Sequence, residues 1–231
     1  MTIKAIALDI DGTITDDKRK ICIEAIKAIR EAENAGVPVI LATGNVIAFT
    51  HAASTLIGST GGLIAESGGV ILRGVIDQRA KVEVLSDTTK PQKAYEYLKQ
   101  EIGQEHEIQL VDDSDMRLSE IAMYRTIPAD LVKSTLKDMD IEVYDTYFAL
   151  HLTDPEINKA TALKVLAKHH GIKTSQILAA GDSENDLDFL TEAGLTIAVN
   201  NATPEVKQAA DYITTKPYGD GVAEAIRKFV L

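Results

Sequence analysis

A short apolar run near the N-terminus, which ends in two carboxylates, constrains the fold more than any other stretch. Residues 4–15 read KAIALDIDGTIT, and residues 5–8 show no polar alternation. Such a run is typical of a strand that is buried on both faces, as in a parallel sheet covered by helices. Asp9 and Asp11 follow directly, and Gly12 then lets the chain turn. If the strand continues through Asp11, both carboxylates lie on one side of it, because side chains alternate along a strand.

The pair Asp9 and Asp11 has two interpretations. Neighbouring carboxylates repel each other and lose hydration, and a divalent cation relieves this cost. The functional interpretation is a Mg²⁺ site with a nucleophilic or acid–base carboxylate. The structural interpretation is a strand followed by an Asp-Gly turn, and for an isolated DxDG the two interpretations are equally good. The rest of the chain decides between them by the partners that it supplies.

Buried strands and helices alternate along most of the chain. Apolar runs predict further strands at 37–42, 61–65, 177–180, 196–199 and 212–214, and a hairpin of residues 70–72 with 75–77. Apolar residues at helical spacing predict helices at 18–35, 46–57, 158–169, one ending at 193, one from 204 and one from 222. This rhythm indicates right-handed crossovers. We therefore predict an α/β fold with a doubly wound, Rossmann-like parallel sheet.

The pattern changes in the middle of the chain. Strands at 82–85, 119–125, 141–145 and 148–152 and helices at 91–102 and 129–139 are typical of a small α+β layer. We predict a core domain formed by residues 1–83 and 154–231, with an inserted domain over 84–153. Acidic residues between 112 and 115 are expected to form a solvated loop, with a metal site as the alternative.

Composition excludes several classes of protein. The chain has 35 acidic and 24 basic residues and a net charge of −11, which argues against nucleic acid or an anionic membrane as a partner. The lone cysteine, Cys22, excludes an internal disulfide and a cysteine-based zinc site. No signal segment and no apolar run near ~18 residues occurs, so we expect a cytoplasmic protein. The absence of GxxxxGK[ST] and GxGxxG motifs weakens NTPase and dinucleotide-binding interpretations.

Polar side chains follow three of the predicted parallel strands. They are Asp9 with Asp11, Thr43, and Asp182 with Asp186. In open α/β sheets the ligand crevice lies outside the carboxyl ends of the strands, so all three groups are expected to meet there. Asp182 and Asp186 are four residues apart, a spacing that can aim both at one cation. Helix capping and pairing with the helix dipole is the structural alternative for these two residues.

Lys159 is placed in the first turn of its predicted helix. This is the unfavourable end for a cation, because a helix N-terminus already carries partial positive charge. The placement is explained if an anion binds between the lysine and the free amides. An ordinary surface lysine is the alternative.

Taken together, these motifs resemble the haloacid dehalogenase superfamily of phosphatases. The resemblance rests on four motifs in the family's order: DxDGT at 9–13, Thr43-Gly44, Lys159, and Gly181-Asp182 with Asp186. The insert follows the second motif, as in members with an α/β cap, the Cof-like and sucrose-phosphate-phosphatase-like enzymes. A small cap with Thr43-Gly44-Asn45 is most similar to the archaeal phosphoglycolate phosphatases. Many Cof-like relatives carry Arg where this chain has Asn45, and relatives usually carry Asn in place of Ser67.

The resemblance implies roles for individual residues. Asp9 is the expected nucleophile, which forms an aspartyl-phosphate, and Asp11 is the expected general acid and base. Phosphoryl oxygens are expected to bind Thr43, Gly44, Asn45 and Lys159. The expected cofactor is Mg²⁺, held by Asp9, the main-chain carbonyl of Asp11, Asp182 and, directly or through a water, Asp186. The implied partner is a small phosphorylated metabolite, 2-phosphoglycolate, and a homodimer is a candidate assembly. The insert is expected to choose the substrate, with Tyr147 and His151 as contacts or, alternatively, as core residues.

Other functions remain as alternatives. A sugar-phosphate phosphatase or a phosphomutase would use the same chemistry. A receiver-type signalling module also places Asp, Thr and Lys around Mg²⁺, but its motif order differs, since Lys159 precedes Asp182 here, and it lacks an insert of ~70 residues. A purely structural or binding α/β protein is the remaining alternative.

Overall fold

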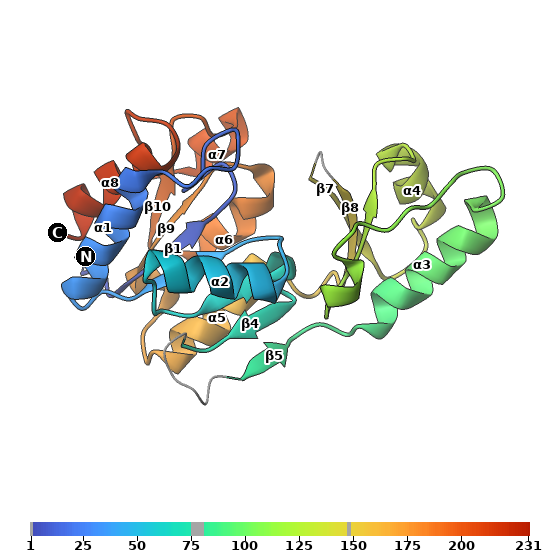
Figure 1. The fold of residues 1–231 in the computed structure, drawn as a ribbon, viewed down its shortest axis with the longest axis horizontal. Helices are drawn as coiled ribbons and strands as arrows, with labels where there is room; N and C mark the ends of the chain where they lie inside the picture. Colours follow the sequence, from blue (N-terminus) through green and yellow to red (C-terminus); the bar gives the residue numbers. More distant parts are fainter. Residues whose placement is uncertain (1, 75–80, 147–148) are drawn as a thin grey trace.

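The computed structural model describes residues 2–74, 81–146 and 149–231, and its main feature is a large mixed sheet (Figure 1). The strand order is β11-β10-β9-β1-β2-β3-β4-β5. Among the described residues, six strands of this sheet are parallel: β1 (Ala5–Asp9), β2 (Val39–Ala42), β3 (Leu63–Ala65), β9 (Ile177–Gly181), β10 (Leu195–Ala198) and β11 (Tyr212–Ile213). Two pair antiparallel at one edge: β4 (Val70–Leu72) and β5 (Val82–Val84). The predicted α/β fold with a parallel-dominated sheet is confirmed.

Helices cover both faces of this sheet. One face carries α1 (Ile23–Asn34), α2 (Ile47–Ile57) and α8 (Tyr218–Phe229), with α1 packed against the other two. The other face carries α5 (Lys159–His169), α6 (Leu187–Glu192) and α7 (Pro204–Ala209). The central strands β1, β2 and β9 are therefore buried along their whole length. Each fully buried Leu or Ile side chain contributes roughly 1.5–3 kcal/mol. Within the described ranges, no helix is long and apolar enough to cross a membrane.

The first helix is shorter than predicted, and the first strand ends before Asp11. The strand ends at Asp9 and does not continue through Asp11, because the amides of Thr13, Ile14 and Thr15 all turn back to the carbonyl of Ile10. The predicted helix over 18–35 begins only at Ile23. A tight turn, closed by a bridge between Thr15 and Ile21, occupies the residues in between.

The last helix begins earlier than predicted, at Tyr218 rather than Val222. Its first turns contain Gly219 and Gly221, and glycine weakens a helical pattern. A Cβ at Gly219 would lie 2.5 Å from the Cβ of Cys22, so close packing against the start of α1 requires glycine there. Tertiary packing therefore overrides a poor local helix propensity.

A second, three-stranded sheet lies beside the first (Figure 1). Its order is β6 (Ile121–Tyr124), β8 (Ala149–Thr153) and β7 (Glu142–Asp145), with α3 (Thr89–Ile102) and α4 (Ala129–Thr135) packed on it. It has its own apolar cluster, which includes Leu98, Met123 and Leu150. The helix predicted over 129–139 ends at Thr135, and the strand predicted at 82–85 joins the large sheet instead.

A separate apolar cluster is typical of a separate domain. The boundaries 84 and 153 stay a prediction. Two expectations fall outside the described residues, namely the hairpin arm at 75–77 and the substrate contact at Tyr147.

Candidate active site

The carboxyl ends of the central strands bring the predicted polar groups together. Asp9 ends β1, which lies between β2 and β9, so Thr43 and Asp182 follow the two neighbouring strands at the same edge. Lys159 joins them from the start of α5, where Asn158 caps the helix. Because parallel strands all end at this edge, residues that are far apart in the sequence share one crevice.

Lys159 is the buried cation of the site, and its side chain is 5% exposed. Its Nζ donates to Asp9 Oδ1 at 2.7 Å and to Asp186 Oδ1 at 2.6 Å. Burial alone lowers the pKa of this ammonium, but the carboxylates of Asp186 and Asp9 outweigh burial and raise the pKa well above its usual value. Lys159 therefore stays charged. The anions at this helix N-terminus are the protein's own carboxylates.

Three buried or half-buried carboxylates face this single lysine. Asp9, Asp182 and Asp186 each offer an oxygen, and these atoms lie within 4.8 Å of one another. Burial, with the charge of Asp186 adding to it, raises the pKa of Asp182 to about 7 and raises that of Asp9 well above its usual value. When all three carboxyls are ionised, one lysine leaves two negative charges uncompensated. Hard carboxylate oxygens in this number fit Mg²⁺.

In the part of the chain that the structure describes, no other group of three or more His, Cys, Asp or Glu side chains is placed to hold a metal. The acidic residues between 112 and 115 are thus no such group. Asp113 forms an ion pair with Arg117 at 3.1 Å, so the predicted solvated loop is partly bound to the protein.

The loops that carry the carboxylates contact one another closely. Gly12 has φ +83°, and a Cβ there would lie 2.4 Å from Asp182 Oδ2, so this position requires glycine. The next residue, Thr13, donates its hydroxyl to Asp182 Oδ1 at 3.1 Å. Asp186 Oδ2 accepts the amides of Asp182 and Ser183 at 3.1 and 3.2 Å. These bonds hold the carboxylate of Asp182 toward β1.

Asp11 has a different set of partners from Asp9. Its Oδ2 accepts the Asn45 amide at 2.7 Å and the Thr43 hydroxyl at 3.2 Å. Its Oδ1 accepts Arg19 Nε at 2.9 Å. The two aspartates of the DxDGT motif therefore sit in two different hydrogen-bond networks, one with Lys159 and one with Thr43 and Asn45.

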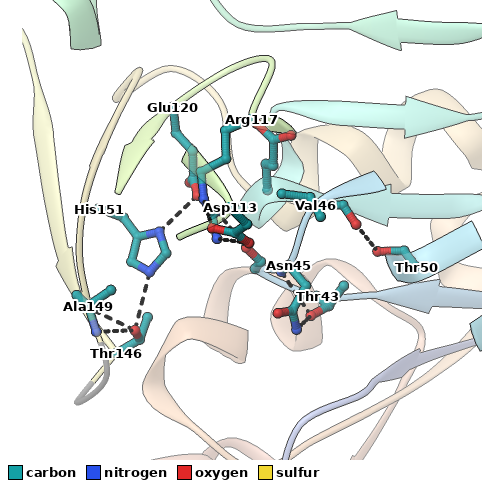
Figure 2. Close-up of polar contacts among 12 residues, drawn as sticks. Thr43, Asn45, Val46, Thr50, Asp113, Arg117, Glu120, Thr146, Ala149 and His151 are labelled. Atoms are coloured by element: carbon teal, nitrogen blue, oxygen red, sulfur yellow. Dashed lines mark hydrogen bonds and ion pairs between the residues drawn. The ribbon is translucent and has the colours of Figure 1, made fainter. Parts of the chain in front are cut away.

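The second sheet reaches the site through Arg117. Its Nη1 donates to the main-chain oxygen of Gly44 at 3.1 Å, directly beside Thr43 and Asn45. Arg117 also pairs with Glu120, whose carboxylate contacts His151 Nδ1 at 2.8 Å (Figure 2). His151 is buried in this polar network and is not packed against apolar core residues alone. No local pattern in the sequence indicated the role of Arg117.

Glu66 makes a further contact between the segments that carry the two sheets. It is 1% exposed and lies in the turn between β3 and β4. Its carboxylate accepts the amides of Leu118 and Ser119 at 3.0 and 2.8 Å and the Ser119 hydroxyl at 2.7 Å. Burial raises the pKa of Glu66, and the hydrogen bonds from Ser119 and Leu118 oppose this rise. Glu66 and its partners are about fifty residues apart in the sequence, so no local motif predicts the contact.

We expect Glu66→Ala to lower the free energy of unfolding by about 2–4 kcal/mol, because it leaves buried donors without an acceptor, at about 1–3 kcal/mol each. Urea unfolding measures this loss. Glu101→Ala removes the same charge from an exposed position of α3 and serves as the control. Equal stability of the two variants would contradict the assigned contact.

Comparison with known proteins agrees with this geometry. The family of haloacid dehalogenase-like hydrolases matches residues 6–148 and 129–226. A phosphoglycolate phosphatase from Methanothermobacter thermautotrophicus is 51% identical over 227 residues, covering 98% of this chain and 99% of the relative. Another, from Methanobrevibacter smithii, is 44% identical and covers 100% of both chains. A crystal structure of a Thermoplasma acidophilum protein has a TM-score of 0.88 at 24% identity and covers 99% of both chains, which shows a shared fold.

The family match and the relatives together define an enzyme, a phosphoric monoester hydrolase. The chain belongs to the haloacid dehalogenase-like hydrolase family. The family that the motifs at Asp9, Thr43, Lys159 and Asp182 predicted is thus confirmed.

Proposed function

We propose that this chain is a Mg²⁺-dependent phosphatase that hydrolyses 2-phosphoglycolate to glycolate through an aspartyl-phosphate on Asp9. The observation that carries the proposal is the bond from Lys159 Nζ to Asp9 Oδ1, 2.7 Å long, beside two further carboxylates. The two relatives named phosphoglycolate phosphatase, 51% and 44% identical over nearly the whole chain, support the substrate.

Asp9 is the nucleophile in this proposal. Lys159 holds Oδ1, so we assign the attack on phosphorus to Oδ2. The P–O ester bond breaks as the new P–O bond to Asp9 forms, and water later hydrolyses the aspartyl-phosphate. This divides one difficult displacement into two easier ones. Burial of Asp9 also keeps competing bulk water away from its carboxylate.

Asp11 serves as general acid and then as general base. It protonates the leaving oxygen in the first step and takes a proton from the attacking water in the second. Asn45 and Thr43 fix its carboxylate by donating to Oδ2 at 2.7 and 3.2 Å. Asp11, the proton-transfer group, is therefore held by other partners than Asp9, the nucleophile, which Lys159 holds.

Charge neutralisation supplies the remainder of the catalysis. We assign the phosphoryl oxygens to Thr43, Gly44, Asn45 and Lys159. A bound Mg²⁺ would be held by Asp9, the main-chain carbonyl of Asp11, Asp182 and Asp186, and would supply positive charge beside the phosphoryl group. The excess negative charge of the three clustered carboxylates supports this assignment.

We further propose that residues 84–153 act as a cap that selects the substrate. The contacts of Arg117 with Gly44 and of Glu66 with Ser119 support this, because they join the second sheet to loops at the catalytic crevice. A cap excludes bulk water and adds substrate contacts. The homodimer and the cytoplasmic location stay predictions.

The test is phosphate release from a panel of phosphomonoesters, measured with Mg²⁺ and after chelation by EDTA. We expect 2-phosphoglycolate to be the preferred substrate. Chelation should lower the rate by about 10²-fold or more, since an uncompensated cluster of carboxylates repels a phosphate dianion, and added Mg²⁺ should restore it.

Other results would favour the alternatives. Preference for sugar phosphates would keep the mechanism and overturn the substrate. Transfer of the phosphoryl group back to a sugar would indicate a phosphomutase. No release from any ester, with Mg²⁺ still binding, would favour a receiver-type module and overturn the proposal.

A further inference from the structure

Arg19 is a second cation at the site, and the proposed mechanism does not use it. Its Nε donates to Asp11 Oδ1 at 2.9 Å, and its Nη2 donates to Asn45 Oδ1 at 3.3 Å. The Arg19 side chain is 51% exposed, whereas that of Lys159 is 5% exposed. Lys159 is therefore the inner cation and Arg19 the outer one. Asn45 is uncharged and belongs to the outer network, since its Nδ2 donates to Asp11 Oδ2 at 2.7 Å.

The guanidinium of Arg19 has unused hydrogen-bond capacity. An arginine side chain has five N–H groups. Two of them, on Nε and Nη2, are used in the contacts with Asp11 and Asn45 among the described residues, which leaves three on Nη1 and Nη2. Because the Arg19 side chain is 51% exposed, a ligand can reach these groups.

The backbone holds Arg19 in an unusual conformation. Its φ is +59°, in the left-handed region that residues other than glycine rarely adopt. The surrounding turn maintains it, because Asp16 Oδ1 accepts the amides of Lys18 and Lys20, both at 2.9 Å, and the Arg19 amide donates to the carbonyl of Asp16 at 2.9 Å. Such conformations persist where the surroundings enforce them, often at ligand sites. The turn thus presents Arg19 in a fixed position beside Asp11, which lowers the entropy cost of binding.

Arg117, the other arginine at the site, lacks this capacity. Its nitrogens donate to Asp113, Glu120 and the carbonyl of Gly44. Its side chain is buried, and two carboxylates of its own segment neutralise it. An anionic substrate group would have to displace these partners, so Arg19 is the better candidate.

We propose that Arg19 binds a carboxylate on the leaving group, so that the enzyme selects phosphomonoesters of small hydroxycarboxylic acids. This rests on the proposed function, in which Asp11 protonates the leaving oxygen. Arg19 Nε donates to this proton-donating carboxylate of Asp11. The remaining N–H groups of Arg19 are therefore assigned to the side of the site where the leaving group binds. The planar guanidinium matches a carboxylate in a bidentate geometry. In 2-phosphoglycolate one methylene separates the ester oxygen from the carboxylate, so both groups fit one Asp11–Arg19 pair.

The experiment compares kcat/KM for 2-phosphoglycolate with that for 2-hydroxyethyl phosphate, which has an alcohol in place of the carboxylate. The variants are Arg19→Met, Arg19→Lys and, as a control, Lys18→Met, which removes an exposed charge from the same turn. We expect Arg19→Met to lose about 10- to 100-fold on 2-phosphoglycolate, the range for a hydrogen bond between charged groups. Its loss on 2-hydroxyethyl phosphate should stay below about threefold. Arg19→Lys should lose an intermediate amount, and Lys18→Met should leave both values unchanged.

Three results would overturn the proposal. Equal losses on both esters would place Arg19 on the phosphoryl group or on Asp11. An unchanged Arg19→Met enzyme that still prefers 2-phosphoglycolate would make the ion pair with Asp11 a surface feature, and would leave the proposed function intact. Wild-type enzyme that releases phosphate from other esters but not from 2-phosphoglycolate would overturn both this proposal and the proposed substrate.

Discussion

Asp9→Asn is expected to abolish phosphate release and to leave the fold intact. An amide cannot form the acyl phosphate, so the covalent step is lost, and removal of a catalytic nucleophile costs about 10⁴-fold or more in rate. Steady-state release from 2-phosphoglycolate measures the loss. Asp17→Asn makes the same chemical change at an exposed position and is expected to keep wild-type activity.

The same substitution should not destabilise the metal-free protein near neutral pH. The pKa of Asp9 is raised in the folded state, chiefly by burial and then by Asp186. A carboxyl group whose folded pKa lies above its unfolded pKa binds its proton more tightly in the native state. Its contribution to stability is therefore present at low pH and is lost as the pH rises through the folded pKa. Asparagine stays neutral at every pH, so the melting temperature should be equal or higher.

Two outcomes would count against this role of Asp9. Activity that survives in Asp9→Asn would exclude the aspartyl-phosphate. A large fall in melting temperature would show that the carboxylate is mainly a structural partner of Lys159, as in the structural and binding alternatives.

Lys159→Met is expected to be the most destabilising change at the site. Methionine preserves the length of the side chain but leaves the carboxylates of Asp9 and Asp186 buried without a cation. Breaking a buried ion pair from one side costs about 3–5 kcal/mol. Urea unfolding at neutral pH without metal measures this loss. Phosphate release should fall as well, because the variant lacks the buried positive charge of Lys159 that binds the phosphoryl group in the proposed mechanism.

Lys164→Met is the matched control on the same helix. Lys164 is 56% exposed and pairs with Glu192 at 2.9 Å, and exposed pairs are worth about 0–1 kcal/mol.

The loss in free energy of unfolding of Lys159→Met should shrink with added Mg²⁺, which replaces the missing charge. It should also be smaller near about pH 5 than near about pH 8, because protonation of carboxyls whose pKa values are raised removes their repulsion. Equal stability losses in the two variants would contradict this assignment.

The motifs located the buried half of the site without knowledge of the structure. Asp9, Thr43 and Asp182 each follow an apolar run that forms a parallel strand. The edge at which parallel strands end is common to all of them, so local order along the chain translates into proximity in space. Lys159 was recognisable because a cation in the first turn of a helix is unfavourable unless an anion compensates it.

Arg19, Arg117 and Glu66 were not predicted as parts of the site. The sequence pattern predicts that Arg19 belongs to a helix from residue 18, but the turn stabilised by Asp16 delays the helix until Ile23 and directs Arg19 to Asp11. The contacts of Arg117 with Gly44 and of Glu66 with Ser119 join segments more than fifty residues apart. Neither contact follows from periodicity, because each involves an ordinary charged residue in an irregular segment.

Apolar periodicity and the order of the motifs were enough to predict the α/β class and the meeting of Asp9, Thr43 and Asp182 at one edge of the sheet. These features depend on burial and on strand direction, which are encoded over a few consecutive residues. The folded chain alone revealed which carboxylate pairs with which cation, where the second sheet contacts the crevice, and that Arg19 faces Asp11. Such contacts depend on distances between remote segments, and those distances exist only after the sheet and its helices have packed.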